Sequence, residues 1–521
     1  MRHFQLNASS ILGLIVLAST SSVVIVTGSP VTEGSQHQTP PSPSGNPWEV
    51  EVPESYDYCK APAPSAKDYK PVPNAKLEFV QLVVRHGDRT SLNMMPHDEA
   101  TWNACTNNLD TTTYSNPKWN RFSRGPGVAL QQRIFSPHGP GTYEYAMYSG
   151  GNCESGQLTD IGKQMHVELG NSLRSIYIDK LEFLPADYKP RSIYLRSTHV
   201  WRTKNSAQSL LSGLYPKKHW ASGKYIPIHT LPERQENLYI NYDSCPRGRE
   251  LEYVAQNETA WMDFLESQKP LWTKIDNIIG LGSYPVYPEA NSWIAWMDML
   301  QPRICHNKPL PCSYNPKTGK RDQEPCVTAA DAKQSLHNAF FSYIHVKRNS
   351  PVSYDYNRLS IGSFLADLVN ELKTVIASSS SSSSSLETQD GEDHDDSETD
   401  STNNVTSDAT KKRHRKHKFS LYSAHDDTVS SLLGTFRADD KNILWPPYRS
   451  NMLFELWKLK GSTTTAAGGK KYIVRVIYNG EVLTLQENNQ WCDLNGCDLD
   501  TFIEYLNKYV PKDLAKECGA M

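Results

Sequence analysis

The chain has 521 residues, and its apolar content of 38% is sufficient for a large hydrophobic core in one domain or two. Its 54 basic and 57 acidic residues give a net charge of −3, which argues against a nucleic-acid-binding protein. A mean hydropathy of −0.58 excludes a protein with many membrane spans. The ten cysteines are an even number, as in exported disulfide-bonded proteins, and they lack the Cys-x-x-Cys and Cys/His spacings of a metal site.

The first 28 residues have the pattern of a secretory signal. Arg2 precedes an apolar segment at residues 11–17, and a second apolar segment follows at residues 23–26. Serines and a threonine separate the two segments, and the total length is near the lower limit for a membrane span. Residues 1–28 are therefore either a cleaved signal peptide, which we favour, or an uncleaved membrane anchor. Both place the rest of the chain outside the cytosol.

Residues 29–74 are rich in Pro, Ser and Gly, so we expect a lead-in of low order before the main domain, residues 75–521. The first predicted strand covers residues 77–84, whose apolar and β-branched composition is typical of a strand buried on both faces of a parallel sheet. The segment Arg85-His86-Gly87-Asp88-Arg89-Thr90 follows this strand directly. Because ligands bind outside the carboxyl ends of strands in open α/β sheets, forked guanidiniums at this place predict a phosphate site.

Strands and helices alternate along the rest of the chain. A helix is predicted over residues 157–177, with Thr159 or Asp160 at its start. The other predicted elements are a strand at 192–196, a helix at 206–211, a helix at 359–376, a strand at 419–423 and a helix beginning at 429. This alternation predicts an α/β fold with three αβα layers and a mostly parallel central sheet.

Two segments interrupt the alternation. Residues from about 251 to 326 contain many Trp residues with helical spacing and no clear strand, so we expect a smaller helical cap at about 236–330. A serine run at 378–385, followed by acidic and basic blocks, predicts a disordered insertion at about 377–417. We favour a surface loop there over a tail that binds metal or nucleic acid.

Two further motifs complete a pattern. Arg196-Ser197-Thr198 and Arg202-Thr203 follow one predicted strand, and Tyr422-Ser423-Ala424-His425-Asp426 ends another. With Arg85-His86-Gly87-Asp88-Arg89, these motifs resemble the histidine acid phosphatase family, branch 2 of the histidine phosphatase superfamily. Shorter similar stretches are residues 156–162, Cys245-Pro246, Pro446-Pro447-Tyr448 and residues 491–497. The resemblance extends over residues 77–518 apart from the insertion.

The resemblance implies a phosphomonoester hydrolase, an acid phosphatase that needs no cofactor. The chain is similar both to Golgi phosphatases that act on phosphorylated xylose and to secreted or lysosomal acid phosphatases, and these branches stay open. We expect a place in the secretory pathway: a secreted protein, or one in the Golgi or lysosomal lumen if the N-terminal segment is retained. The resemblance also makes a homodimer an open alternative to a monomer. Sequons at Asn257 and Asn404 add weak support for a glycoprotein.

A phosphomonoester dianion must be neutralised before a nucleophile reaches phosphorus, and Arg85, Arg89 and Arg202 can supply forked donors. By resemblance, His425 donates to a phosphate oxygen as a further substrate-binding residue. His86 would attack phosphorus and form a phosphohistidine that water hydrolyses.

Asp426 would protonate the leaving alkoxide and then help to activate water. Asp88 and Asp427 are expected to have structural roles.

Each assignment has a structural alternative. A histidine beside glycine is often a turn residue, and Arg85 and Arg89 could pair with Asp88. We favour the functional interpretation because separated motifs agree. The motif around Arg202 is looser, and Ser91 stands where many members of the family carry proline.

Spacing and resemblance predict three disulfides, Cys492–Cys497, Cys245–Cys518 and Cys105–Cys153. Three pairings stay open among the remaining cysteines, Cys59, Cys305, Cys312 and Cys326. Two other functions also stay open: an inactive relative that binds a phosphate ligand or a protein, and a mutase that moves phosphate between hydroxyls. The intact His86 and Asp426 argue against the first, and the secretory signal argues against the second.

Overall fold

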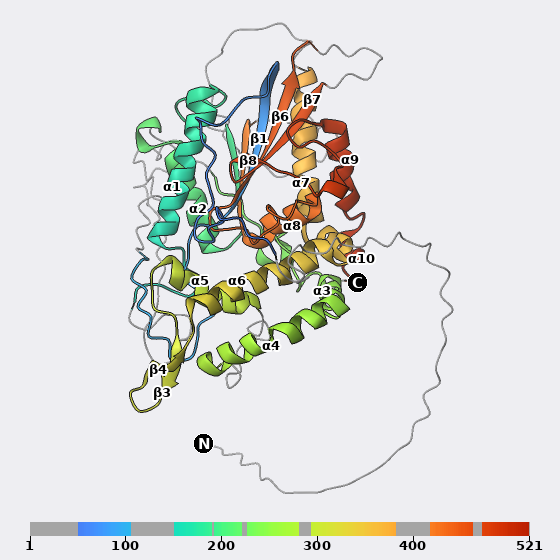
Figure 1. Ribbon diagram of the computed structural model, residues 1–521. Helices are drawn as coiled ribbons and strands as arrows, with labels where there is room; N and C mark the ends of the chain where they lie inside the picture. Colours follow the sequence, from blue (N-terminus) through green and yellow to red (C-terminus); the bar gives the residue numbers. More distant parts are fainter. Residues whose placement is uncertain are drawn as a thin grey trace, which may run out of the picture. The chain divides into compact units, whose positions relative to one another are not determined.

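A seven-stranded mixed β-sheet forms the centre of the fold, in the order β2-β5-β1-β6-β7-β8 with β9 also paired to β7 (Figure 1). The computed structural model describes residues 50–105, 151–189, 192–220, 227–280, 293–381, 417–461 and 471–519. The strands of this sheet are β1 Ala75–Arg85, β2 Ile193–Ser197, β5 Phe419–Ala424, β6 Asn451–Leu459, β7 Tyr472–Tyr478, β8 Glu481–Val482 and β9 Cys497–Asp498. All three predicted strands are confirmed to within two residues at each end.

The strands that carry the predicted motifs are parallel. β1 pairs with β5, and β5 pairs with β2, both in parallel register. β6 is antiparallel to β1, and β7 is antiparallel to β6, so β7 runs in the direction of β1. The α/β class is confirmed, with β2, β5, β1 and β7 sharing one direction. The sequence analysis did not name the strands from β6 to β9.

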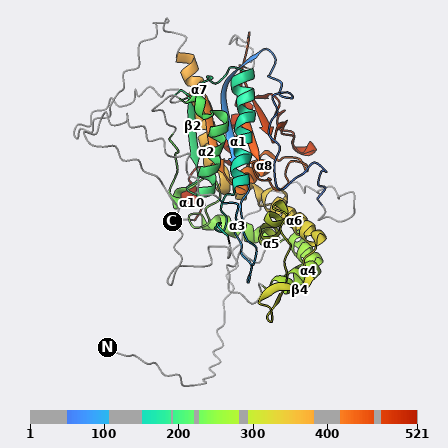
Figure 2. The same ribbon diagram turned by 90° about the vertical axis from the view of Figure 1, so that its left-hand side faces the viewer.

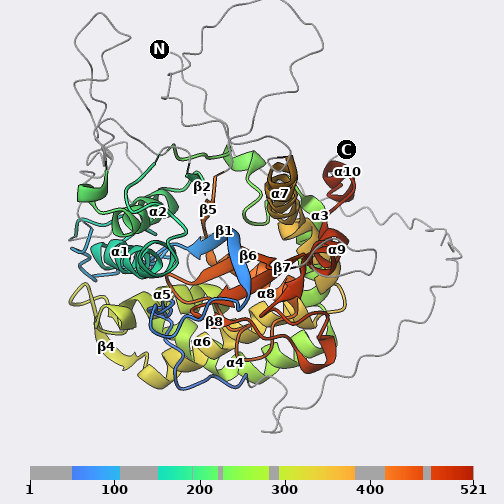
Figure 3. The same ribbon diagram turned by 90° about the horizontal axis from the view of Figure 1, so that it is seen from above.

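Helices cover both faces of the sheet, as the view from above shows (Figure 3). The helices of these layers are α1 Asp160–Arg174, α2 Trp201–Leu214, α7 Ser353–Ser381, α8 Asp426–Phe436 and α9 Leu499–Tyr509. β1 contributes to both hydrophobic cores: Val80, Leu82 and Val84 pack with α1 and α2, and Phe79 and Val83 pack on the side of α7, α8 and α9. The three αβα layers are therefore confirmed, with β1 buried on both faces.

A helical layer lies beyond one end of the sheet (Figures 1 and 2). Its helices are α3 Pro246–Gln256, α4 Thr259–Ile279, α5 Trp293–Cys305 and α6 Ala329–Ile344. We call this layer the cap. The expectation that no strand occurs between residues 251 and 326 was wrong, because Cys312–Asn315 (β3) and Lys320–Cys326 (β4) form an antiparallel hairpin. The polar sequence of β4 lacks the alternation of a half-buried strand.

Residues 50–74, the described part of the expected low-order lead-in at 29–74, contain no helix or strand but pack against the domain. Tyr58 and Ala61 are buried, and Cys59 is bonded to Cys305 of α5. The composition of this segment therefore predicts correctly that it lacks helices and strands. It does not predict the packing, which depends on aromatic side chains and a disulfide.

The five disulfides leave no free cysteine among the described residues. The three predicted pairs are confirmed, namely Cys105–Cys153, Cys245–Cys518 and Cys492–Cys497. The four cysteines whose pairing was open form Cys59–Cys305 and Cys312–Cys326. The first of these joins the lead-in to the cap, and the second closes the β3–β4 hairpin.

Several sequence predictions lie outside the described residues. These are the signal or anchor at 1–28, the sequon at Asn404 and most of the insertion at 377–417. α7 continues to Ser381, so the first residues of the expected insertion are helical. In the part of the chain that the structure describes, no helix has the length and apolar character needed to cross a bilayer.

A buried polar cluster centred on Glu455 of β6 joins the lead-in, the helical segment Ser175–Lys180 that follows α1, and β7. Its Oε1 accepts hydrogen bonds from the hydroxyls of Tyr69 and Tyr177 at 2.7 and 2.5 Å. Its Oε2 accepts from Trp457 Nε1 at 3.0 Å and from Arg475 Nε at 2.8 Å. Burial raises the pKa of both tyrosines and so does the Glu455 carboxylate, so both hydroxyls remain donors.

Substitution of Glu455→Leu should lower the free energy of unfolding by about 3–5 kcal/mol, because it leaves the buried charge of Arg475 unpaired. The measurement is urea denaturation followed by circular dichroism. Glu250→Gln is the control, because its pair with Arg247, at 2.9 Å, is exposed and should contribute less than about 1 kcal/mol. Equal effects of the two substitutions would contradict this role of the cluster.

Candidate active site

Three strand ends meet at one edge of the sheet. The parallel register places Arg85 beside Ala424 and Ser197 beside Ser423, so the residues that follow β1, β5 and β2 converge. The imidazoles of His86 and His425 lie with their ring centroids 5.6 Å apart. The structure brings together all the residues predicted for the site, namely Arg85, His86, Arg89, Arg202, His425 and Asp426.

His86 is buried, and the adjacent backbone determines its tautomer. Its Nδ1 lies 2.8 Å from the carbonyl oxygen of Gly87. A carbonyl can only accept, so Nδ1 carries the proton and Nε2 keeps its lone pair. Burial lowers the pKa of this imidazole well below its usual value, as do the nearby guanidiniums of Arg202, Arg85 and Arg89. The ring is therefore neutral, with one nitrogen able to act as a nucleophile.

Arg85 is held in place from several sides. Its Nη1 donates to the carbonyl oxygen of Pro446 at 2.5 Å, and its Nη2 lies 2.8 Å from Oδ2 of Asp426. The guanidinium carbon is 4.4 Å from the ring centroid of Tyr448 and 5.5 Å from that of Tyr58. These contacts fix the direction of the guanidinium, whose Nε has no hydrogen-bond partner among the described residues.

Asp426 is the first residue of α8, and it is ionised. Burial alone would raise the pKa of this carboxyl, but the positive charge of Arg85, followed by that of Arg89, lowers it to about 2. Trp445 Nε1 donates a further hydrogen bond to Oδ2 at 3.2 Å. Asp426 is thus a carboxylate over the ordinary pH range.

Arg89 pairs with a carboxylate from the cap. Its Nη1 lies 2.6 Å from Oδ1 of Asp298, which belongs to α5, and both side chains are buried. The other carboxylate oxygen, Oδ2, accepts from the hydroxyl of Ser91 at 2.9 Å and from the backbone N–H groups of Leu92 and Asn93 at 2.8 Å. One carboxylate thus anchors both the guanidinium and the loop that follows it.

Arg202, in the first turn of α2, is different. Its guanidinium makes no hydrogen bond and no ion pair with any residue in the described ranges, and its enclosed Nε is unpartnered there. Burial lowers the pKa of Arg202 to about 10, and the like charge of Arg89 contributes to this shift. The side chain still carries its proton at physiological pH, so it is a positive charge that no described residue pairs with directly.

His425 lies opposite His86, where its Nε2 is 3.0 Å from the hydroxyl oxygen of Thr198. Thr198 follows β2, so this contact connects two of the converging strand ends. Burial lowers the pKa of His425 well below its usual value, and the charge of Arg202 lowers it further. The second imidazole of the site is therefore also neutral.

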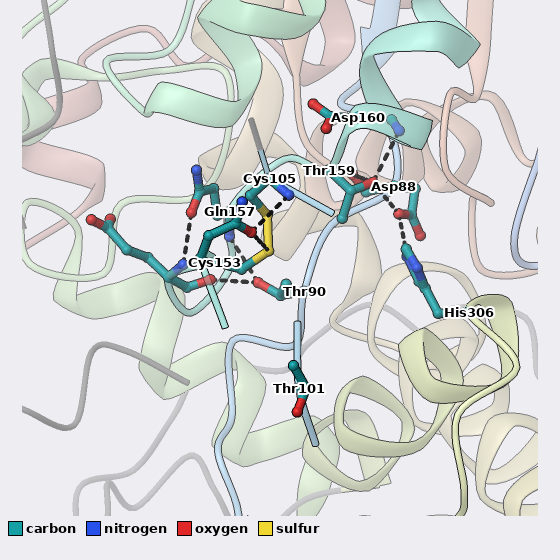
Figure 4. The surroundings of a disulfide bond; sticks show 12 residues. Asp88, Thr90, Thr101, Cys105, Cys153, Gln157, Thr159, Asp160 and His306 are labelled. Carbon is teal, nitrogen blue, oxygen red and sulfur yellow. Dashed lines mark hydrogen bonds and ion pairs between the residues drawn. A yellow bond between two sulfur atoms is a disulfide. The ribbon is translucent and has the colours of Figure 1, made fainter. Parts of the chain in front are cut away.

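Asp88 does not pair with the neighbouring arginines, which was the structural alternative for its motif. Its Oδ2 accepts from the hydroxyl of Thr159, the residue that caps α1, and lies 2.6 Å from Nε2 of His306 at the end of α5 (Figure 4). A Cβ at Gly162 would come within 2.2 Å of the Asp88 carbonyl oxygen, so only glycine permits this close approach. Asp88 therefore fixes the loop between α1 and the cap.

The sequence analysis missed several residues of the site, above all Asp298. A signal for Asp298 exists, since it is the one acidic residue in the otherwise apolar run Trp293–Leu300. Tyr448 belongs to the stretch Pro446-Pro447-Tyr448, which was noted only as similar to the family. Tyr58 lies in the lead-in, and no periodicity or motif marks it. Across the described ranges, no three His, Cys, Asp or Glu side chains are grouped as metal ligands would be.

Comparison with known proteins gives a family. The chain matches the histidine phosphatase superfamily (branch 2) over residues 76–479. Among similar curated proteins, counting factor 60 of Dictyostelium discoideum is 26% identical over 477 residues, which cover 89% of this chain and 92% of that protein. Prostatic acid phosphatase of Homo sapiens is 26% identical over 460 residues, 85% of this chain and 88% of that protein.

Among solved structures, the phytase of Citrobacter braakii aligns with a TM-score of 0.46 and 14% identity, covering 85% of this chain and 99% of that one. The family match spans most of the chain and contains both histidine motifs. The chain therefore belongs to the histidine phosphatase superfamily, branch 2, and the enzyme is a phosphatase.

Proposed function

We propose that this phosphatase is an acid phosphatase that hydrolyses phosphomonoesters through a phosphohistidine on His86. The unpaired guanidinium of Arg202 is the observation that carries this proposal. A half-buried cation without a protein partner is unfavourable unless an anion occupies the site. Arg85 and Arg89 each have one carboxylate partner, so Arg202 leaves one positive charge in excess beside the nucleophile.

The geometry supports a two-step reaction. In the first step, Nε2 of His86 forms a bond to phosphorus while the bond from phosphorus to the leaving oxygen breaks, and Asp426 transfers its proton to that oxygen. In the second step, water gives a proton to the Asp426 carboxylate, and the oxygen of that water bonds to phosphorus while the bond from phosphorus to Nε2 of His86 breaks. This step releases phosphate and neutral His86. Arg85, Arg89, Arg202 and His425 would donate to the phosphoryl oxygens throughout.

The ionised state of Asp426 explains why such an enzyme would work best in acid. Asp426 does not itself hold the proton that the leaving group needs, because the arginines lower its pKa to about 2. A phosphomonoester loses its second proton at a pKa of about 6, so the monoanion delivers a proton with the substrate. Its negative charge also offsets the arginines and raises the affinity of Asp426 for that proton.

We also propose that the protein acts in the secretory pathway or outside the cell. The five disulfides require an oxidising compartment, and the apolar segments at residues 1–28 supply the expected route of export. An inactive relative that only binds a phosphate ligand is the alternative, and the assays below distinguish the two.

His86→Ala should abolish turnover of an aryl phosphate, with a loss of roughly 10⁴-fold or more, because it removes the imidazole that forms the proposed covalent intermediate. Turnover is measured by phosphate release at mildly acidic pH. His229→Ala is the control, because that imidazole is exposed and its ring stacks on Tyr194, which is not one of the proposed site residues. A folded wild-type protein that releases no phosphate would instead favour the inactive relative.

Arg202→Met should make the protein more stable but weaken its binding of phosphate. Removal of this cation should raise the free energy of unfolding by about 1 kcal/mol, while inorganic phosphate should bind roughly 10- to 100-fold more weakly. Thermal unfolding with and without phosphate measures both effects, since bound phosphate raises the melting temperature. Arg247→Met, at an exposed position, should change neither. A loss of stability at position 202 would indicate a structural role.

Asp426→Asn should slow alkyl phosphates much more than aryl phosphates. A poor alkoxide leaving group needs the proton that Asp426 supplies, so we expect a loss of about 10²-fold or more for alkyl esters. A phenolate leaves without protonation, so the aryl ester should lose less than about tenfold. The measurement is the steady-state kcat of wild type and Asp426→Asn on both substrates. Equal losses would contradict the role of Asp426 as proton donor.

A further inference from the structure

Asp427, expected from the sequence to be structural, is an exposed acid beside the proposed proton donor. Its side chain is 54% exposed, whereas its ion-pair partner Lys347, at 3.5 Å, is only 5% exposed. Lys347 is enclosed by the protein: its Nζ donates to Ser431 Oγ at 2.9 Å and lies 5.3 Å from the ring centroid of Tyr343. An incoming molecule therefore meets the carboxylate of this pair and not the ammonium.

The position of Asp427 relates it to the leaving group. Its backbone N–H donates to Oδ1 of Asp426 at 3.2 Å, so both carboxylates belong to the first turn of α8. Tyr239 lies on the same side, since its ring meets that of His425 edge-on at 5.6 Å and Asp427 contributes to raising its pKa. We name Asp426, Asp427 and Tyr239 the leaving-group wall.

The two sides of the site differ in the sign of their charge. The guanidiniums of Arg85, Arg89 and Arg202 lie on the side proposed to bind phosphate. Asp427 itself is faced by Asp426 on α8, by Lys347, by Arg85 on β1 and by Glu252 on α3. Arg85 is already paired with Asp426, and Lys347 is enclosed. The exposed charge of the leaving-group wall is consequently negative, opposite in sign to the three guanidiniums.

We propose that Asp427 selects the leaving group by charge, so that the preferred substrates are phosphomonoesters of amino alcohols. In such esters a protonated amine lies a few bonds from the ester oxygen, within reach of the Asp427 carboxylate when Asp426 contacts that oxygen. Esters whose leaving group is itself an anion are disfavoured by the same charge. This inference rests on the proposed hydrolase function and on the assignment of Asp426 as proton donor.

Three substrates of matched size test the proposal: phosphoethanolamine, ethylene glycol monophosphate and phosphoglycolate, whose leaving groups are cationic, neutral and anionic. Partial burial raises the pKa of Asp427 while Lys347 opposes the shift, so the assays belong near neutral pH, where the carboxylate is ionised. The wild-type enzyme should have the highest kcat/KM on phosphoethanolamine and the lowest on phosphoglycolate. The ratio between these two should narrow at high salt, because ions screen an exposed charge.

Asp427→Asn should reduce the ratio of kcat/KM for phosphoethanolamine over phosphoglycolate by roughly 3- to 10-fold, the effect of one partly exposed charge at close range. Asp427→Glu should restore most of the ratio, because it keeps the charge. Asp440→Asn is the matched control: Asp440 is an exposed partner of buried Arg348, at 2.6 Å, and lies beyond the opposite end of α8. It should leave the ratio unchanged.

The outcomes separate the two proposals. A ratio that is the same in wild type and Asp427→Asn, or a wild-type preference for phosphoglycolate, overturns the selection by charge while the hydrolase function stands. If Asp427→Asn does not fold, the wild-type enzyme alone gives the test. A ratio of kcat/KM for phosphoethanolamine over phosphoglycolate that does not change with salt concentration overturns the selection by charge. Failure of the folded wild-type enzyme on all three esters and on an aryl phosphate overturns the proposed function itself.

Discussion

The mutual repulsion of three guanidiniums around one neutral imidazole is the constraint on which the rest of the site depends. Arg85, Arg89 and Arg202 converge at a single sheet edge, and each lowers the pKa of His86. Asp426 offsets one charge from the start of α8, and Asp298 offsets another from the cap. Within the described ranges the third charge has no such partner, and the anion site that we propose rests on that remainder.

The supporting elements are arranged around this constraint. Asp88 turns away from the arginines toward Thr159 and His306, which leaves the guanidiniums to their own carboxylates. The lead-in places Tyr58 against Arg85, and Cys59–Cys305 joins the lead-in to the same helix that carries Asp298. Segments that are distant along the chain thus hold a few charged groups in one arrangement.

The sequence predicted the parallel strands, the three layers and the family because each leaves a local signature: a β-branched run, a capped amphipathic helix or a compact motif. It did not predict the hairpin β3–β4, whose polar strand is held by Cys312–Cys326. Asp298 and Tyr58 were missed because their importance arises from contacts across distant parts of the chain. The placement of the predicted site residues rests on strand register, whereas their protonation states come from burial and from the charges of the three arginines.

The Asp298 carboxylate binds Arg89 through one oxygen and the loop after Arg89 through the other, and this limits the movement of α5. Swinging α5 away from the sheet would break the pair with Arg89 and at the same time release Ser91, Leu92 and Asn93. Such a displacement would strand a buried negative charge and free a buried positive one, which is costly on both sides. The cap is thereby locked electrostatically to the loop that follows β1, and a hinged opening of this helix is disfavoured.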